Sequence, residues 1–224
     1  MESITFVCLS KSKKNHDYCV AGKILKKDGT YGGWIRPINQ YGTINDENCS
    51  YENGESVSWL HVVTAEFIEK KPQKFQTENH LINEESHWKH IKNYEYEKKE
   101  LMHLCDNPNT LWVNNHQTNS GKFDQVSPEE VKGMTESLYF IFVDELTFYS
   151  TRWQDEKIKL RGEFTYKNVT YNLKVTDLYW LNHYETEPLG SHILKEKFLT
   201  VSLALDTYTN VSGTFHYKIL AEVL

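Results

Sequence analysis

The chain has 224 residues, of which 39% are hydrophobic and 25% charged, and its formal net charge at pH 7 is −6. These proportions are typical of a chain that buries a core, and the length allows one large or two small domains, so an intrinsically disordered protein is excluded. No window reaches the roughly 18–20 consecutive apolar residues of a membrane-spanning helix, and the N-terminal residues lack the order of a secretory signal. We therefore predict a cytoplasmic protein with no membrane partner.

The cysteine and histidine positions indicate no redox or metal chemistry. Cys8, Cys19, Cys49 and Cys105 form no CxxC pair and no zinc-finger spacing, and a disulfide framework is not expected in a protein without a secretory signal. Histidines 80, 87 and 90 match no ligand pattern. We expect no metal site and no cofactor.

Charge is distributed unevenly along the chain. Residues 1–37 contain seven Lys or Arg against three acids, whereas the remaining residues contain 18 against 28 and sum to −10. The net negative charge argues against a protein that coats nucleic acid over its whole surface. If the chain binds an anion, the N-terminal segment is the first place to look. Alternatively, Lys11, Lys13 and Lys14 are a solvated loop.

Short apolar or alternating runs rich in Tyr, Phe and Trp recur along the chain and predict strands. In the first half we expect strands at 3–9, 16–26, 30–37 and 57–69, followed by an apolar run at 111–114. In the second half we expect strands at 137–152, 157–166, 168–175, 197–205 and 213–223. Asp28-Gly29 and Lys167-Asn168 are predicted hairpin turns, because Gly and Asn tolerate positive φ.

Helical signals are few. The spacing of Leu101, Leu104 and Cys105 predicts a helix over about 91–105, and Ser127 to Glu130 form a capping box that predicts a short helix. A third helix is expected at about 177–184, capped by Thr176 or Asp177.

The polar stretch 115–135 separates two apolar regions and predicts the boundary between two units, 1–126 and 127–224. In the second unit, the order of three strands, one helix and two strands is that of an OB fold, a five-stranded Greek-key barrel, although a generic β-meander is an alternative. The first unit starts in the same way. The predicted fold is mainly β, with two tandem OB-like barrels and a few short helices.

The richest candidate segment runs from residue 10 to 37 and contains Lys11, Lys13, Cys19 and Lys23. Trp34 offers a stacking face and Arg36 a planar fork for phosphate or a base edge. The two are two residues apart on a predicted strand and therefore share a face. The alternative is that Trp34 belongs to the core and Arg36 pairs with an acid.

A second candidate is the loop 76–82, in which Asn79 and His80 offer an amide and an imidazole that can read a base or polarise a water. Equally, this loop can be a turn whose side chains satisfy backbone groups. The enzyme motifs GxSxG, HExxH, GxGxxG and Walker A are absent. A nucleotide-processing enzyme would have to use His80, Glu78 and Cys19 as acid, base and nucleophile, with no reaction fixed and no catalytic residue assigned.

Several motifs together resemble the dual OB-containing domain family. They are Ser-Lys-Ser at 10–12, D-Y-C-V-A-G-K at 17–23, G-G-W-I-R-P-I at 32–38, Q-T-E-N-H-L-I at 76–82, L-W-V-N at 111–114, R-G-E-F-T-Y at 161–166 and L-K-V-T-D at 173–177. The resemblance spans the whole chain, and its N-terminal motifs are the most specific. It implies a prokaryotic protein with two OB-like barrels and a role in nucleic-acid or nucleotide recognition, within conflict or defence systems. It supplies no catalytic residues, and it makes 10–36 and 76–80 candidates for lining one site.

The leading hypothesis is a binding module that accepts single-stranded nucleic acid or a nucleotide-like ligand in its first barrel. Trp34 would stack a base, Arg36, Lys11 and Lys13 would contact phosphate, and Asn79 and His80 would read polar edges. Cys19 and Lys23 would line the same site. Two alternatives stay open: an adaptor or sensor that binds a protein partner without nucleic acid, and the nucleotide-processing enzyme.

Overall fold

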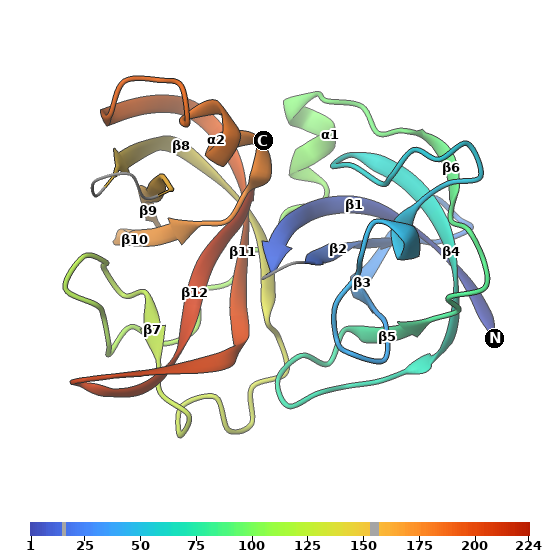
Figure 1. Cartoon of the computed structure of the whole chain (residues 1–224), viewed down its shortest axis with the longest axis horizontal. Coiled ribbons are helices and arrows are strands. Elements are labelled where there is room, and N and C mark those ends of the chain that lie inside the picture. The colour runs from blue at the N-terminus through green and yellow to red at the C-terminus, as the bar shows by residue number, and fades with distance from the viewer. Residues whose placement is uncertain (15–16, 153–156) are drawn as a thin grey trace. The chain divides into compact units, whose positions relative to one another are not determined.

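The structure is a computed structural model that describes residues 1–14, 17–152 and 157–224 (Figure 1). Its contacts divide the chain into two units, Met1–Leu104 and Cys105–Leu224, each with its own six-stranded sheet. The predicted mainly β fold with tandem OB-like barrels is confirmed. No helix among the described residues is long and apolar enough to cross a membrane.

The first unit is a closed barrel of five strands with one additional strand at its side. The strands are β1 (Glu2–Lys14), β2 (Asp17–Leu25), β3 (Tyr31–Ile38), β4 (His61–Lys70), β5 (Asn79–Ile82) and β6 (Lys89–Asn93). They follow the order β1-β2-β3-β5-β4-β6, and a further pairing between β1 and β4 closes the ring. The β3–β5 pairing is parallel and the other pairings in the ring are antiparallel. Residue 16, where the second strand was expected to start, lies outside the described residues.

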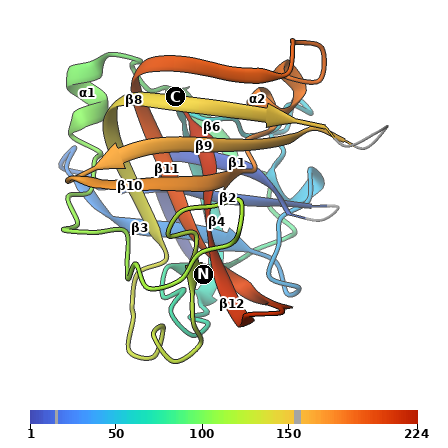
Figure 2. The same ribbon diagram turned by 90° about the vertical axis from the view of Figure 1, so that its left-hand side faces the viewer.

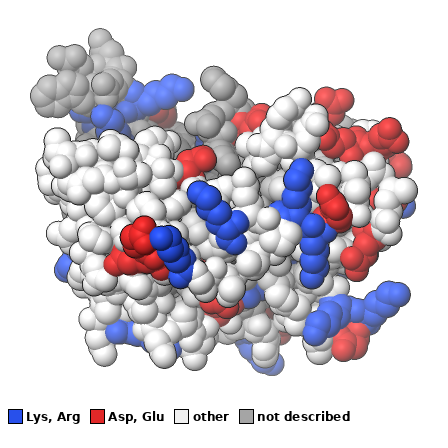
Figure 3. Space-filling model, turned by 90° about the horizontal axis from the view of Figure 1, so that it is seen from below, with Lys and Arg blue, Asp and Glu red and all other residues white. Residues whose placement is uncertain are grey.

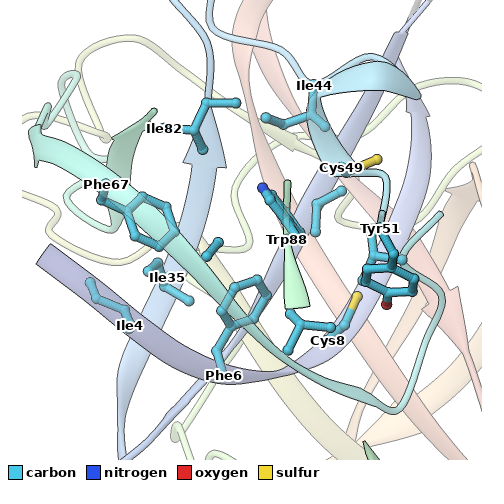
Figure 4. Packing of buried hydrophobic residues seen from close by; sticks show 14 residues of the cluster. Ile4, Phe6, Cys8, Ile35, Ile44, Cys49, Tyr51, Phe67, Ile82 and Trp88 are labelled. Carbon is cyan, nitrogen blue, oxygen red and sulfur yellow. The ribbon is translucent and has the colours of Figure 1, made fainter. Parts of the chain in front are cut away.

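The first core follows from the alternation of side chains along strands. Ile4, Phe6 and Cys8 of β1 point into the barrel (Figure 4), where the rings of Phe6 and Trp88 meet edge to face with centroids 5.6 Å apart. Burying a large apolar side chain contributes about 1.5–3 kcal/mol. Gly22 allows β2 to approach β1 closely, because a Cβ at this position would lie 2.1 Å from a β1 carbonyl oxygen.

The second unit has the same connectivity. Its strands are β7 (Gln125–Val126), β8 (Leu138–Thr151), β9 (Lys159–Tyr166), β10 (Val169–Val175), β11 (Gly190–Asn210) and β12 (Gly213–Val223). The order is β10-β9-β8-β11-β12-β7, and a parallel pairing between β10 and β12 closes the ring. In both units the strands of the ring therefore pair as first, second, third, fifth, fourth and first again, with third and fifth parallel. This is the Greek-key arrangement of the OB fold.

Residues ahead of β8 complete the second barrel. The backbone of Lys122 exchanges two hydrogen bonds of 3.1 Å with that of Asn172 on β10, and β7 pairs with β12. These contacts assign residues 105–126 to the second unit, and the division by contacts falls after Leu104, earlier than the boundary expected at 126.

The two predicted hairpin turns and the predicted N-cap of the third helix are present in the structure. Lys167 and Asn168 have φ values of +46° and +66°, as a two-residue type I′ hairpin requires. The β2–β3 turn is a three-residue loop instead, in which the Gly29 N–H donates to the Lys26 carbonyl at 3.0 Å and only Gly29 has a positive φ, +82°. Asp177 caps α2 (Leu178–His183) by accepting a hydrogen bond of 3.2 Å from the Trp180 backbone N–H.

The helix expected over 91–105 is wrong in its first part. Residues from 89 to 93 form β6, which pairs with β4, and only α1 (Lys98–Met102) is helical. The residues that suggested a helix, Leu101, Leu104 and Cys105, all lie at the C-terminal end of the range 91–105. The structure of residues 89–93 is determined instead by their pairing with the distant strand β4.

Two further expectations need correction. The apolar run 111–114 is not a strand, since Trp112 has a φ of +60°. The capping box forms, with Ser127 N–H donating to Glu130 Oε2 at 2.8 Å and Glu130 N–H to Ser127 Oγ at 3.4 Å, but it begins a succession of turns and not a helix.

Candidate functional site

Lys11 and Lys13 lie at the end of β1, and Tyr18 lies near the start of β2, directly opposite Lys13. The Nζ atoms of Lys11 and Lys13 are 4.5 and 5.2 Å from the centroid of the Tyr18 ring. Cations at this distance are attracted to the face of an aromatic ring. We call these three residues, together with Asp46 and Ser56, the rim cluster. The two lysines therefore belong to a strand and not to a solvated loop.

Asp46 is the anion that the rim cluster holds. Its carboxylate accepts hydrogen bonds from Lys11 Nζ at 3.1 Å, from the Tyr18 hydroxyl at 3.1 Å and from Ser56 Oγ at 3.3 Å. Partial burial of the carboxyl works against ionisation, but the bonds from Lys11 and Tyr18 outweigh it and lower the pKa of Asp46. The pKa of Tyr18 is raised, by burial first and then by its bond to Asp46. At neutral pH the cluster is thus an ionised carboxylate surrounded by three donors.

The second group of predicted residues lies on the outer face of β2 and β3. Lys23 is opposite Trp34 in the strand pairing, and its Nζ is 4.9 Å from the Trp34 ring. Arg36 donates from Nε to Glu78 Oε1 at 3.1 Å, and its Nη2 is 3.0 Å from the same oxygen. The Arg36 and Glu78 side chains are 7% and 6% exposed. The alternative in which Arg36 pairs with an acid is therefore what the structure shows.

Asn79 and His80 do not converge. Asn79 is opposite Arg36 in the parallel β3–β5 pairing, whereas His80, the next residue along the strand, packs its ring against the core residue Phe67 with centroids 5.7 Å apart. His80 Nδ1 lies 2.8 Å from the Glu78 carbonyl oxygen. Burial lowers the pKa of His80, and within the part of the chain described its Nε2 has no hydrogen-bond partner.

The three residues of the enzyme alternative have separate partners. Cys19 is half-buried opposite Ser12 in the β1–β2 pairing, the Glu78 carboxylate is bound by Arg36, and His80 packs into the core. Among the described contacts none joins the Cys19, Glu78 and His80 side chains to one another, and their acid, base and nucleophile roles stay predictions.

Three members of the rim cluster, Tyr18, Asp46 and Ser56, escaped the sequence reasoning. Tyr18 could have been found, because residues that flank a tight hairpin face each other across it. Asp46 gave no such signal, since it is brought to Lys11 from a polar insertion 35 residues further along the chain.

The surface charge is mixed on the face drawn in Figure 3. Lys and Arg side chains lie among Asp and Glu side chains, and the described residues form no continuous basic track on that face. On that face a binding surface therefore has to be local.

Two closed five-stranded rings of the same connectivity define a protein of two OB-like barrels in one chain. The chain belongs to the DuOB family, the Dual OB-containing domain, whose family model matches residues 4–223. No curated protein matches the chain.

Among the solved structures that resemble it distantly are the following two. One, a murine DNA-binding protein bound to double-stranded DNA, has a TM-score of 0.33 and 9% identity, over 99% of this chain and 97% of that one. The other, described as structural mimicry for functional antagonism, has a TM-score of 0.30 and 11% identity, over 98% of this chain and 87% of that one.

Proposed function

We propose that the chain binds single-stranded nucleic acid or a nucleotide-like ligand, and that the rim cluster of the first barrel is the contact. In OB folds the loop between the first two strands is one of the elements that bind oligonucleotides. Lys11, Lys13 and Tyr18 lie at the base of this loop in the first barrel. Basic side chains beside an aromatic ring are the combination that follows a phosphate backbone and stacks a base.

The observation that carries the proposal is the convergence of three donors on one exposed anion. Lys11, Tyr18 and Ser56 all bind the Asp46 carboxylate, whose side chain is 66% exposed, whereas that of Lys11 is 15% exposed. A phosphate oxygen that replaced this carboxylate would find the same donors already oriented. Because Asp46 is largely solvated, moving it aside costs little, about 0–1 kcal/mol for an exposed ion pair.

The other predicted contacts support this proposal less. Arg36 and Lys23 are buried, and Arg36 has an anionic partner within the fold. Trp34, Asn79, His80 and Cys19 stay predictions as ligand contacts, as does the place in a prokaryotic defence system that the family resemblance implies.

The test is binding of a fluorescein-labelled dT oligonucleotide, followed by anisotropy over a salt series. Lys11→Gln combined with Lys13→Gln removes two cations, and the matched control is Lys26→Gln combined with Lys27→Gln on the exposed β2–β3 turn of the same barrel. We expect the first pair to weaken binding and to reduce the slope of log K against log salt by about 1.4, or about 0.7 for each phosphate that a lysine no longer neutralises. Equal affinities and slopes for the two pairs would contradict the proposal.

The protein-partner alternative makes a different prediction. An adaptor would bind no oligonucleotide in this assay, and its acidic remainder would favour a basic protein partner. A stable complex with such a partner in the absence of nucleic acid would favour this alternative.

A further inference from the structure

On β9 and β10 of the second barrel, apolar side chains fill the interior and basic side chains lie on the outer face. In β9, Leu160 and Phe164 are buried, whereas Arg161 between them is only partly buried. In β10, Leu173 is buried and the next residue, Lys174, is exposed. Because successive side chains on a strand point to opposite faces, Arg161 and Lys174 lie on the outside of the barrel.

The register of three neighbouring strands aligns an aromatic ring with these two cations. Tyr149 of β8 is directly opposite Arg161 of β9, which is in turn opposite Lys174 of β10. Directly opposed residues share one face, with Cβ atoms about 4.5–5.5 Å apart. Tyr149 is 38% exposed, and Figure 2 shows β8, β9 and β10 running side by side nearest the viewer. We call Tyr149, Arg161 and Lys174 the outer row.

The guanidinium of Arg161 is held in place by hydrogen bonds to Asn172 and Asp124. Its Nε donates to Asn172 Oδ1 at 2.6 Å, and its Nη2 donates to Asn172 O at 2.6 Å and to Asp124 Oδ2 at 2.7 Å. Its Nη1 donates to no residue that the structure describes, and the side chain is 20% exposed. Gly121 makes this arrangement possible, because a Cβ there would lie 2.3 Å from Arg161 Nη2 and 1.9 Å from Asp124 Oδ2. Two donor groups are thus used to fix the guanidinium, and the third remains for a ligand.

The charge on and beside this face is locally positive in an acidic chain. The charged side chains on the outer face of β8, β9 and β10 are Glu145, Lys159, Arg161, Glu163 and Lys174, and Lys122 and Asp124 lie beside that face. Four of the seven are basic and three acidic, while the whole chain carries −6. Glu145 is paired with Lys195 of β11. Asp124 is buried and paired with Arg161, and Glu163 accepts a hydrogen bond of 3.3 Å from Asn172. The exposed charges are therefore mainly cations.

From this geometry we infer that the outer row is a second binding surface for single-stranded nucleic acid, on the second barrel. β9 and β10 are the second and third strands of the ring, and this pair of strands is the oligonucleotide-binding face of OB folds. Tyr149 stacks a base, while Arg161 and Lys174, which follow it along the row, contact consecutive phosphates. The inference rests on the proposed function for the class of ligand but adds a site independent of the rim cluster.

The experiment uses the full chain and a fluorescein-labelled dT oligonucleotide of about 30 nucleotides, long enough for two OB sites of about 4–16 nucleotides each. The test variants are Tyr149→Ala and Lys174→Gln. Their matched controls are Tyr179→Ala, an exposed aromatic on α2, and Lys132→Gln, a lysine whose side chain is 70% exposed. Arg161 is left intact, because its removal would leave Asp124 buried without its ion-pair partner.

We expect Tyr149→Ala to weaken binding about tenfold and Lys174→Gln to reduce the salt slope by about 0.7. The controls should bind like the wild type, and far-ultraviolet circular dichroism should be unchanged in all four variants.

The outcomes separate this inference from the proposed function. If the outer-row variants bind like their controls while the Lys11/Lys13 pair loses affinity, the second surface is wrong and the rim cluster stands. If only the outer-row variants lose affinity, the second surface stands and the rim cluster is wrong. A folded wild-type protein that binds no oligonucleotide would overturn both.

Discussion

Lys218 of β12 gives the stability of the second barrel a dependence on pH that can be measured. Its side chain is fully buried, and Nζ donates to the Val113 carbonyl at 2.6 Å and to Asn114 Oδ1 at 2.9 Å. Nζ also lies 5.3 Å from the centroid of the Tyr171 ring. All of these partners are neutral, so none repays the loss of hydration of an ammonium group.

The size of this pH dependence follows from the pKa of Lys218. Burial lowers the pKa of Lys218 from 10.5 to about 7, although the charges of Asp124 and Glu130 oppose the shift. Between these two values the unfolded chain binds one proton more than the folded chain, so stability rises with pH, by up to about 1.4 kcal/mol per pH unit. Because the Lys218 side chain of the folded protein is still half protonated at its own pKa, the free energy of unfolding rises by about 2 kcal/mol between about pH 7 and about pH 9.

The assay is urea denaturation of the wild type and of Lys218→Met at both pH values. Met keeps the apolar stem of the side chain but does not titrate, and groups that titrate alike in both proteins cancel from the difference. We expect the free energy of unfolding of the wild type, relative to the variant, to rise by about 2 kcal/mol from about pH 7 to about pH 9. A difference that is the same at both pH values would refute the reasoning.

Three further substitutions test other parts of the molecule. Arg36→Ala removes one member of the buried Arg36–Glu78 ion pair and should lower the free energy of unfolding by about 3–5 kcal/mol in urea denaturation; a loss below about 1 kcal/mol would show that the pair is not buried as described. Asp46→Asn removes the internal anion of the rim cluster and should tighten oligonucleotide binding about two- to fivefold by anisotropy, whereas weaker binding would show that Asp46 is needed. Gly22→Ala should destabilise the first barrel by about 1–3 kcal/mol and lower its Tm, while Gly33→Ala, with nothing within 4 Å of the added Cβ, should not; equal Tm values would contradict the close packing.

The barrels could be predicted from the sequence because their signals are local. Alternation along the strands and the turn residues at Asp28-Gly29 and Lys167-Asn168 fix where the strands that flank these two turns end and start, whereas β11 (Gly190–Asn210) extends well beyond the expected 197–205. The helix expected over 91–105 failed because residues 89–93 find a partner in β4, which is distant in the sequence. Pairing of this kind outweighs a weak local preference.

The candidate sites were harder to predict for the same reason. Arg36 is bound to Glu78, 42 residues away, and Lys11 is bound to Asp46, 35 residues away. Neither contact has a signature in the chain near the basic residue. The outer row needs the register of three strands, and a shift of one residue in either pairing would move its side chains to the other face.

The central claim, that this chain binds single-stranded nucleic acid, is tested most directly by measuring the affinity of the wild-type protein for labelled dT and rU oligonucleotides over a salt series. We predict saturable binding at low salt that weakens linearly in log K against log salt, with a slope of about −0.7 for each phosphate contact. A folded protein that binds neither oligonucleotide at low salt, or whose affinity is independent of salt, would contradict it.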